Sequence, residues 1–250
     1  KKLVLKRLAV LPVLLWLVAS VTFAVVQAAP VTYADAIDNP RLTPEARTQL
    51  KALYGRDQGR RGQYVRWLGA LAQGDLGRSF LFKRPLVEVI TTALPPTLLL
   101  AGTALAMDFI LGVVLAIISA RKPGGWIDRI LTILSLGVYG LPSFWLAGLA
   151  ILVFSLTLGW LPASHMASVG ADRWDAGARW VDLIRHLILP ASILGIVGAA
   201  STARYLRASL LDVRRSQHIL AARARGLSEQ RILWVHTLRP ALGPLVTLIG

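Results

Sequence analysis

The 250-residue sequence has no cysteine and only two methionines, and 16% of its residues are charged, against about 25% in soluble domains. Without cysteine there is no disulfide framework, no thiolate metal site and no cysteine nucleophile. The four histidines show no HxxxH or HExxH spacing, so the sequence indicates no zinc site. No GxxxxGKS or GxxxxGKT motif occurs, so we expect no phosphate-binding loop, no cofactor and no ATPase activity in this chain.

Hydrophobic residues, by contrast, make up 55% of the chain, and the mean hydropathy is +0.58. A helix needs about 20 apolar residues to cross a bilayer. Four segments satisfy this requirement: 8–29, 94–119, 130–158 and 186–206. A fifth apolar segment begins near 241 and reaches Gly250, which is about 15 Å of helix or half a bilayer. The sequence therefore predicts an all-α polytopic membrane helix bundle with four full spans and a truncated fifth.

The formal net charge of +15 is unevenly divided between the segments that separate these spans. One set of segments holds 15 basic residues in 52 positions and a net charge of +12, whereas the other holds 13 in 91 and a net charge of +4. Because positive charge marks the cytoplasmic side, we expect an inner-membrane protein with a cytoplasmic N-terminus. Nucleic-acid binding, another use of a basic patch, does not fit a chain this apolar. The cytoplasmic segments would be 1–7, 121–129 and 204–239, and the external ones 30–93 and 159–185.

Short helices are expected in the first external region, over 43–55, over 62–73 and from Pro85 onward. We interpret them either as amphipathic helices at the membrane surface or as a small helical cap packed on the bundle. The second external region contains Trp174 and Trp180. These tryptophans are either interfacial anchors or part of a surface that receives substrate.

Asp108 lies near the middle of the second predicted span. An ionised carboxylate there costs about 2.5–3.5 kcal/mol, so the side chain should face the bundle interior or water. Three interpretations stay open: a residue of the transport pathway, a structural residue bonded to a hydroxyl such as that of Thr103 or Thr132, or a protonated side chain. The glycine pairs 137/140 and 195/198 predict close approach between helices.

The arginine-rich segment 204–240 predicts a compact cytoplasmic projection. We expect a helix from about Leu211 to Arg225, a break at Gly226, and a second helix capped by Ser228 that returns to the membrane. Such a projection suits docking into a groove on a soluble partner. The alternative is a basic anchor that binds anionic lipid.

At these residues the sequence resembles the inner-membrane permeases of binding-protein-dependent ABC importers, and within them the dipeptide/oligopeptide/nickel branch. That family carries a cytoplasmic loop written EAA-x3-G-x9-I-x-L-P, and the peptide branch usually shows TARAKGL. The equivalent here is AARARGL, Ala221 to Leu227, with Ala222 and Gly226 in the expected places and Leu220 instead of the glutamate. His236 and Leu238 stand where I and L belong, and Pro240 comes one residue late.

The resemblance extends over nearly the whole chain, because further landmarks of the family occur in the same order. They are GDLGRS (74–79), LPSFWLAG (141–148), GWLP (159–162), HLILPA (186–191) and the pair Arg204 and Arg207. Departures from the family pattern include Gln217 and His218 in place of an acidic-Tyr pair, and His165 in place of a usual glycine.

The resemblance implies one half of a permease dimer that imports substrate, with di- or oligopeptides expected. Its partners would be cytosolic ATP-binding subunits, a second permease subunit, identical or homologous, an external substrate-binding protein and membrane lipids. The implied parts are 1–29 as N-terminus and first span, 30–93 as external region, and 94–250 as permease core with a coupling loop at 207–235. Coupling to the ATPase would run through 220–231, and the motif residues are Leu220, Ala221, Ala222, Arg223, Gly226 and Leu227.

Two other classes of protein remain as alternatives. A secondary transporter or channel would work without an ATPase, and intramembrane acids such as Asp108 would favour it. A membrane enzyme would need a serine and a histidine at the same depth, but the histidines fall at or beyond the ends of the predicted spans.

Overall fold

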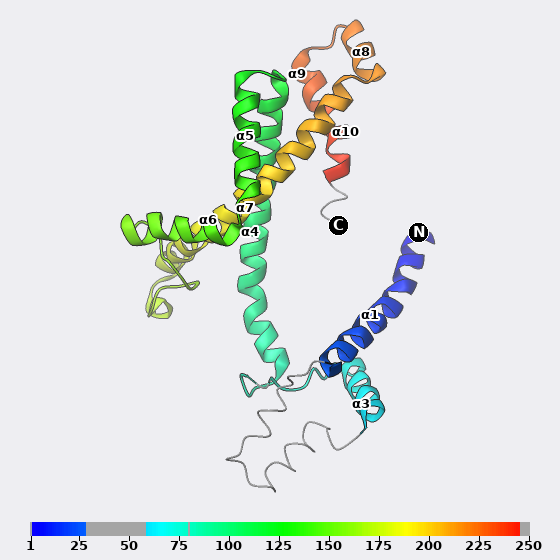
Figure 1. Ribbon diagram of the computed structural model, residues 1–250, viewed down its shortest axis with the longest axis vertical. Helices are drawn as coiled ribbons and strands as arrows, with labels where there is room; N and C mark the ends of the chain where they lie inside the picture. Colours follow the sequence, from blue (N-terminus) through cyan, green and yellow to red (C-terminus); the bar gives the residue numbers. More distant parts are fainter. Residues whose placement is uncertain (1, 29–58, 80, 246–250) are drawn as a thin grey trace. The chain divides into compact units, whose positions relative to one another are not determined.

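The computed structural model describes residues 2–28, 59–79 and 81–245, and these ranges fold into helices joined by turns and loops, with one isolated antiparallel bridge between Arg78 and Pro85 (Figure 1). The chain divides into two compact units, Lys1–Thr92 and Ala93–Gly250. The helix predicted over 43–55 lies outside the described residues, as does the end of the predicted fifth span.

The first unit contains helix α1, Lys2–Ala28, and helix α3, Arg60–Ala72. The aromatic side of α3 packs on α1: the Phe23 ring lies 5.3 Å from that of Tyr64 and 5.4 Å from that of Trp67. The hydroxyl groups of Ser20 and Tyr64 are also hydrogen-bonded at 2.6 Å. The predicted helix 62–73 therefore packs on α1, a helix long and apolar enough to cross a membrane.

A tight turn follows α3 and leads into helix α4, Leu86–Arg121. Gly74 and Gly77 adopt φ values of 79° and 76°, which other residues rarely do, and the Gly77 amide donates to the Asp75 carboxylate at 2.8 Å. The short helix predicted from Pro85 is not separate from the second span. It continues as α4 through two internal prolines, so α4 is 36 residues or about 54 Å long.

The second unit is built on α4 and the helices that follow it. They are α5 (Trp126–Gly140), α6 (Ser143–Ala150), the π-helical η2 (Ile151–Thr157), η3 (Ala171–Arg173), α7 (Ala176–Arg214), α8 (Gln217–Ala224), α9 (Glu229–Arg231), the π-helical η4 (Ile232–Leu238) and α10 (Arg239–Ala241). Three helices of the described chain, α1, α4 and α7, are long and apolar enough to cross a membrane. A bent pair, α5 with α6–η2, makes a fourth if it counts as one span.

The predicted span 130–158 is not one straight helix. It bends by 99° between Gly140 and Ser143. Leu141 is extended, with φ −92° and ψ 139°, because a residue before proline avoids helical backbone and Pro142 has no N–H to continue the helix. Each arm has 15 residues, about 22 Å, which is shorter than the hydrocarbon core.

Helices α4 and α7 approach closely at two glycines. A Cβ added at Gly195 would lie 2.7 Å from Cβ of Met107, and one at Gly198 would lie 2.7 Å from the carboxylate oxygen Oδ2 of Asp108 on α4. Close approach is therefore confirmed for this pair. It is wrong for Gly137 and Gly140, whose Cβ positions have no neighbour within 4 Å in the described chain.

The densest core of the second unit lies where the last turns of α4 and α7 meet the returning helices η4 and α10. Its buried members are Ala116, Ile117, Ala120, Leu206, Leu210, Leu238, Ala241 and Leu245. This core fixes the base from which α8 projects (Figure 1).

Candidate coupling site

The segment that the motif singles out folds as a helix, a glycine turn and a second helix. α8 follows α7 after Arg215 and Ser216, so the single helix predicted from Leu211 to Arg225 is wrong. The break falls there because Ser216 is extended and its hydroxyl donates to the Val213 carbonyl at 2.5 Å, which stops α7 locally.

The turn after α8 lies at Gly226, where the sequence predicts the break. Gly226 has φ 74°, in the left-handed region that glycine adopts without steric cost. Ser228 then caps the next helix, accepting a hydrogen bond from the Arg231 amide at 3.4 Å. Both expectations are confirmed.

A small apolar core holds α8 against the returning helix. Ile219 and Ala222 are fully buried, and Ile232 is nearly so. Leu227 packs against these three residues, which we call the coupling core. The small side chain of Ala222 lets the two helices come together.

The other motif residues lie on the outside of this hairpin. Leu220 is 55% exposed, and Ala221 is also exposed. Arg223 donates to the Glu229 carboxylate at 2.7 Å across the turn. This hydrogen bond, together with the charge of Arg223, holds the pKa of the Glu229 carboxyl below its usual value. Leu220 and Ala221 therefore form an exposed apolar patch beside the ion pair of Arg223 and Glu229.

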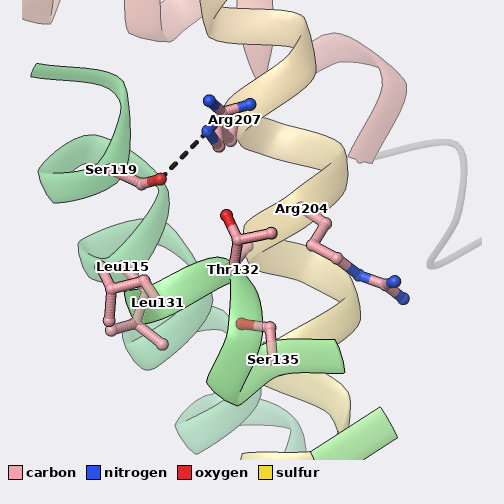
Figure 2. Close-up of a pocket in the computed structure, with 8 residues that line it drawn as sticks. Leu115, Ser119, Leu131, Thr132, Ser135, Arg204 and Arg207 are labelled. Atoms are coloured by element: carbon pink, nitrogen blue, oxygen red, sulfur yellow. Dashed lines mark hydrogen bonds between the residues drawn. The ribbon is translucent and has the colours of Figure 1, made fainter. Parts of the chain in front are cut away.

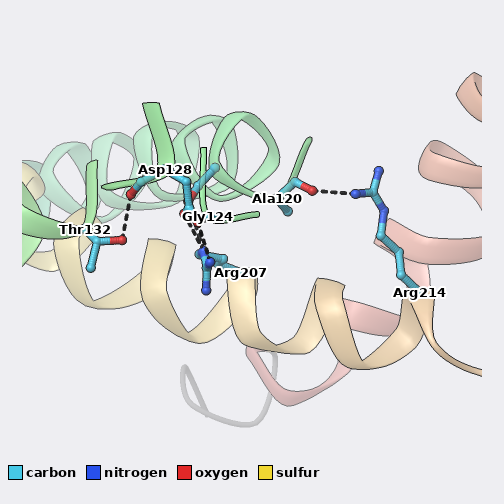
Figure 3. Close-up of polar contacts among 7 residues, drawn as sticks. Ala120, Gly124, Asp128, Thr132, Arg207 and Arg214 are labelled. Carbon is cyan, nitrogen blue, oxygen red and sulfur yellow. Dashed lines mark hydrogen bonds and ion pairs between the residues drawn. The ribbon is translucent and has the colours of Figure 1, made fainter. Parts of the chain in front are cut away.

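An ion-pair network joins α7 to α4 and α5, about three turns before α8 begins (Figure 3). Arg207 on α7 makes two hydrogen bonds to Asp128 on α5, at 2.7 and 2.6 Å. Ser119 on α4 and the Gly124 amide also donate to the Asp128 carboxylate, the latter at 2.7 Å. We call these four residues the Asp128 network; it joins three elements at the level where α4 and α5 are connected.

Next to the Asp128 network lies a cavity of about 10 Å³ between α4, α5 and α7 (Figure 2). This volume accommodates about one water molecule. The Arg204 side chain lies over the Tyr139 ring at 4.5 Å, and its Nε has no hydrogen-bond partner in the described chain. The lining residues are Leu115, Ser119, Leu131, Thr132, Ser135, Ala203, Arg204 and Arg207.

Asp108 lies on the contact between α4 and α7 and does not line this cavity. Its Oδ2 is 2.7 Å from where a Cβ of Gly198 would stand, and its Oδ1 is buried without a hydrogen-bond partner in the described chain. The expected bonds to Thr103 or Thr132 are wrong, because both hydroxyls donate to backbone carbonyls of their own helices. Its role in a pathway stays a prediction.

A second polar cluster secures the other end of α7. Asp182 accepts hydrogen bonds from the Ser168 amide at 2.8 Å and the Ser168 hydroxyl at 2.6 Å. Buried His186 lies one turn further along, with Nδ1 2.8 Å from the Asp182 carbonyl oxygen. The loop before α7 is thus tied to the helix.

Comparison with known proteins agrees with this architecture. Residues 112–250 match the family model of the binding-protein-dependent transport system inner membrane component. The chain belongs to this family. It is therefore a multi-pass inner-membrane permease component of a binding-protein-dependent transport system, and a secondary transporter or channel is not favoured.

Individual relatives match over nearly the whole chain. The oligopeptide transport system permease protein AppB of Bacillus subtilis is 34% identical over 98% of this chain and 76% of its own length. A putative peptide transport system permease protein of Brucella abortus is 36% identical over 99% and 77%. The di/tripeptide transport system permease protein DppB of Pseudomonas aeruginosa is 32% identical over 98% and 77%.

Sequence reasoning missed the Asp128 network and the Ser168–Asp182 contact. Asp128 was visible as an acid in a basic connecting segment, but its partner Arg207 lies 79 residues away and nothing local points to it. The spacing of Asp182 and His186, one helical turn apart, was a weak local signal for the second cluster.

Proposed function

We propose that this permease forms half of the pathway of an ATP-driven importer and couples to a cytosolic ATPase through residues 220–231. The coupling core carries the proposal. It fixes α8 and the Gly226 turn internally, so Leu220 and Ala221 are left exposed on a rigid hairpin. An exposed apolar patch on an otherwise basic segment suits a groove on a soluble subunit better than solvent.

The proposed partners follow from the family to which the chain belongs. Two cytosolic ATP-binding subunits would hydrolyse ATP, because this chain has no phosphate-binding motif. A second permease subunit would supply the other half of the pathway, and an external binding protein would deliver substrate. The charge distribution supports a cytoplasmic α8 and a cytoplasmic N-terminus.

Short peptides are the substrates we propose. The support is that relatives from three organisms carry names that specify oligopeptide, peptide or di/tripeptide transport. Deleting the gene should abolish uptake of labelled di- to pentapeptides. Unchanged peptide uptake with loss of another solute would reassign the substrate and leave the coupling proposal intact.

Co-purification tests the coupling proposal. Leu220→Asp puts a charge into the proposed contact and should reduce the co-purified ATPase subunit and the uptake at least tenfold. Gln217→Asp is the matched control, because Gln217 is exposed in the first turn of the same helix. Normal assembly and uptake in Leu220→Asp would refute coupling through 220–231.

Single cysteines in this cysteine-free chain test the orientation. Val169→Cys should react with an impermeant maleimide added outside intact cells, and Lys122→Cys only after permeabilisation. Both positions are exposed in the structure. The reverse labelling pattern would place α8 on the external side and would overturn the proposed docking.

A further inference from the structure

The Asp128 carboxylate is saturated with hydrogen bonds. One oxygen accepts from Arg207 Nε and the Ser119 hydroxyl, and the other accepts from Arg207 and the Gly124 amide. A carboxylate offers about four acceptor sites, so none is left for water. The Asp128 side chain is 5% exposed and that of Arg207 is 30% exposed.

Each donor to this carboxylate comes from a different structural element. Ser119 belongs to the last turn of α4, Gly124 to the connection between α4 and α5, and Arg207 to α7, two turns before that helix ends at Arg214. A bidentate arginine–carboxylate pair fixes orientation as well as distance. The Asp128 network therefore holds α7 in one rotation relative to the α4–α5 hairpin.

A second contact, closer to α8, also joins α7 to α4. Arg214, the last residue of α7, donates to the Ala120 carbonyl near the end of α4 (Figure 3). Only Arg215 and Ser216 then separate α7 from α8. The start of α8 is thus attached to the α4–α5 hairpin at two levels, one and three turns away.

We infer that the Asp128 network makes α8 and the α4–α5 hairpin one rigid body, so that a displacement of α8 is passed to α4 and α5. Asp128 and Arg207 are positioning residues in this inference, because they act through the helices that they join. The inference rests on the proposed function, in which α8 receives the displacement from an ATPase. The alternative is that α7 bends and α8 moves alone.

Distance measurement on the assembled transporter tests this inference directly. Spin labels on Lys122→Cys and Gln217→Cys, both exposed positions, report the distance from the α4–α5 connection to α8. The distance distribution should be narrow and should keep the same mean without nucleotide and with bound ATP. In Asp128→Asn it should broaden to at least twice the width or shift when ATP binds.

Transport measurements on the same variants separate positioning from folding. Asp128→Asn should keep the ATPase subunit bound and keep basal ATP hydrolysis within twofold, while uptake falls at least fivefold. Arg207→Lys, which keeps the charge but loses the bidentate geometry, should fall between Asp128→Asn and wild type. Asp212→Asn is the matched control: the same change on α7, at an exposed carboxylate with no hydrogen bond among the described residues.

The outcomes distinguish this inference from the proposed function. An unchanged distance distribution and unchanged uptake in Asp128→Asn, with normal assembly, would overturn the inference and leave the docking proposal standing. An equal uptake defect in Asp212→Asn would also overturn it. If Asp128→Asn does not assemble, Arg207→Lys and Ser119→Ala replace it, and wild-type distances and uptake in both would overturn the inference.

Discussion

Two regions of the second unit, the α8 end and the arm formed by α6 and η2, differ in how many of their side chains are buried within the chain. At the α8 end, the Asp128 carboxylate accepts four hydrogen bonds, and Leu206, Leu210 and Ile219 are fully buried. In the arm formed by α6 and η2, no residue is buried, and Phe144 is 78% exposed. The first region is packed within the chain, whereas the second leaves an apolar surface exposed.

An apolar groove runs beside this arm. It lies between α5, α6–η2 and α7, has a volume of about 270 Å³ and is apolar throughout. Its lining residues are Val138, Leu146, Leu149, Ala150, Val153, Phe154, Ile193, Ile196 and Val197. The chain thus packs on itself at its α8 end and leaves an open apolar surface along the arm.

The largest effect should come from a charge placed in the coupling core. Ala222→Asp would bury an unpaired carboxylate at a position with 0% exposure, at a cost of about 3 kcal/mol or more. We expect the ATPase subunit to be lost on purification and uptake to be abolished, while membrane insertion is unaffected. Wild-type assembly of Ala222→Asp would show that the coupling core accepts a buried charge, and that the α8 end is packed less tightly than its buried residues indicate.

A methyl group at the α4–α7 crossing should have the next largest effect. Gly195→Ala would bring Cβ to 2.7 Å from Met107 Cβ and 3.2 Å from the Ala104 carbonyl oxygen, costing about 1–3 kcal/mol in detergent. Gly137→Ala is the matched control: its Cβ meets nothing within 4 Å, so it should be neutral or stabilise by up to about 1 kcal/mol. Thermal unfolding of the two variants measures the difference, and equal melting temperatures would contradict it.

The glycine turn should be less costly to disturb. Gly226→Val forces a β-branched residue to φ 74°, at a cost on the order of 1–2 kcal/mol, and should misplace Ser228 to Arg231. The expected readout is reduced co-purification of the ATPase subunit with normal membrane levels of the permease. Gly226→Asn, which tolerates this backbone better, should retain more of the assembly.

Acid should weaken the turn slightly through Glu229. Because the pKa of this carboxyl is lowered in the folded chain, its contribution is complete above its usual value of 4.5 and is lost as pH falls through the lowered value. Glu229→Gln should therefore melt below wild type at neutral pH and match it in acid. Parallel melting curves at all pH values would show that the Arg223 pair contributes nothing.

The smallest effect is expected in the exposed arm. Phe144→Ala should change the stability of the detergent-solubilised chain by no more than about 0.5 kcal/mol, because almost the whole side chain lies outside the chain's own core. A clear loss of stability would show that the arm packs on this chain, and the contrast between the two ends would fail.

The sequence predicted the elements that depend on local chemistry. Hydropathy located the membrane-spanning segments, and Gly226 with Ser228 located the turn and cap of the coupling hairpin. Pro142 lay inside an apolar run, and hydropathy does not show that a run is bent. The Asp128–Arg207 pair was beyond local patterns, because any of several arginines would have satisfied the same charge count.

The π-helical geometry of η4 sets where the returning helix reaches Pro240. A π-helix bonds each residue to one five positions away, so it holds one residue more than an α-helix of equal length. η4 spans Ile232–Leu238, between Gly226 and Pro240, and Pro240 stands in the first turn of α10. Pro240 therefore lies nearer to the Gly226 turn than an unbroken α-helix over the same residues would place it.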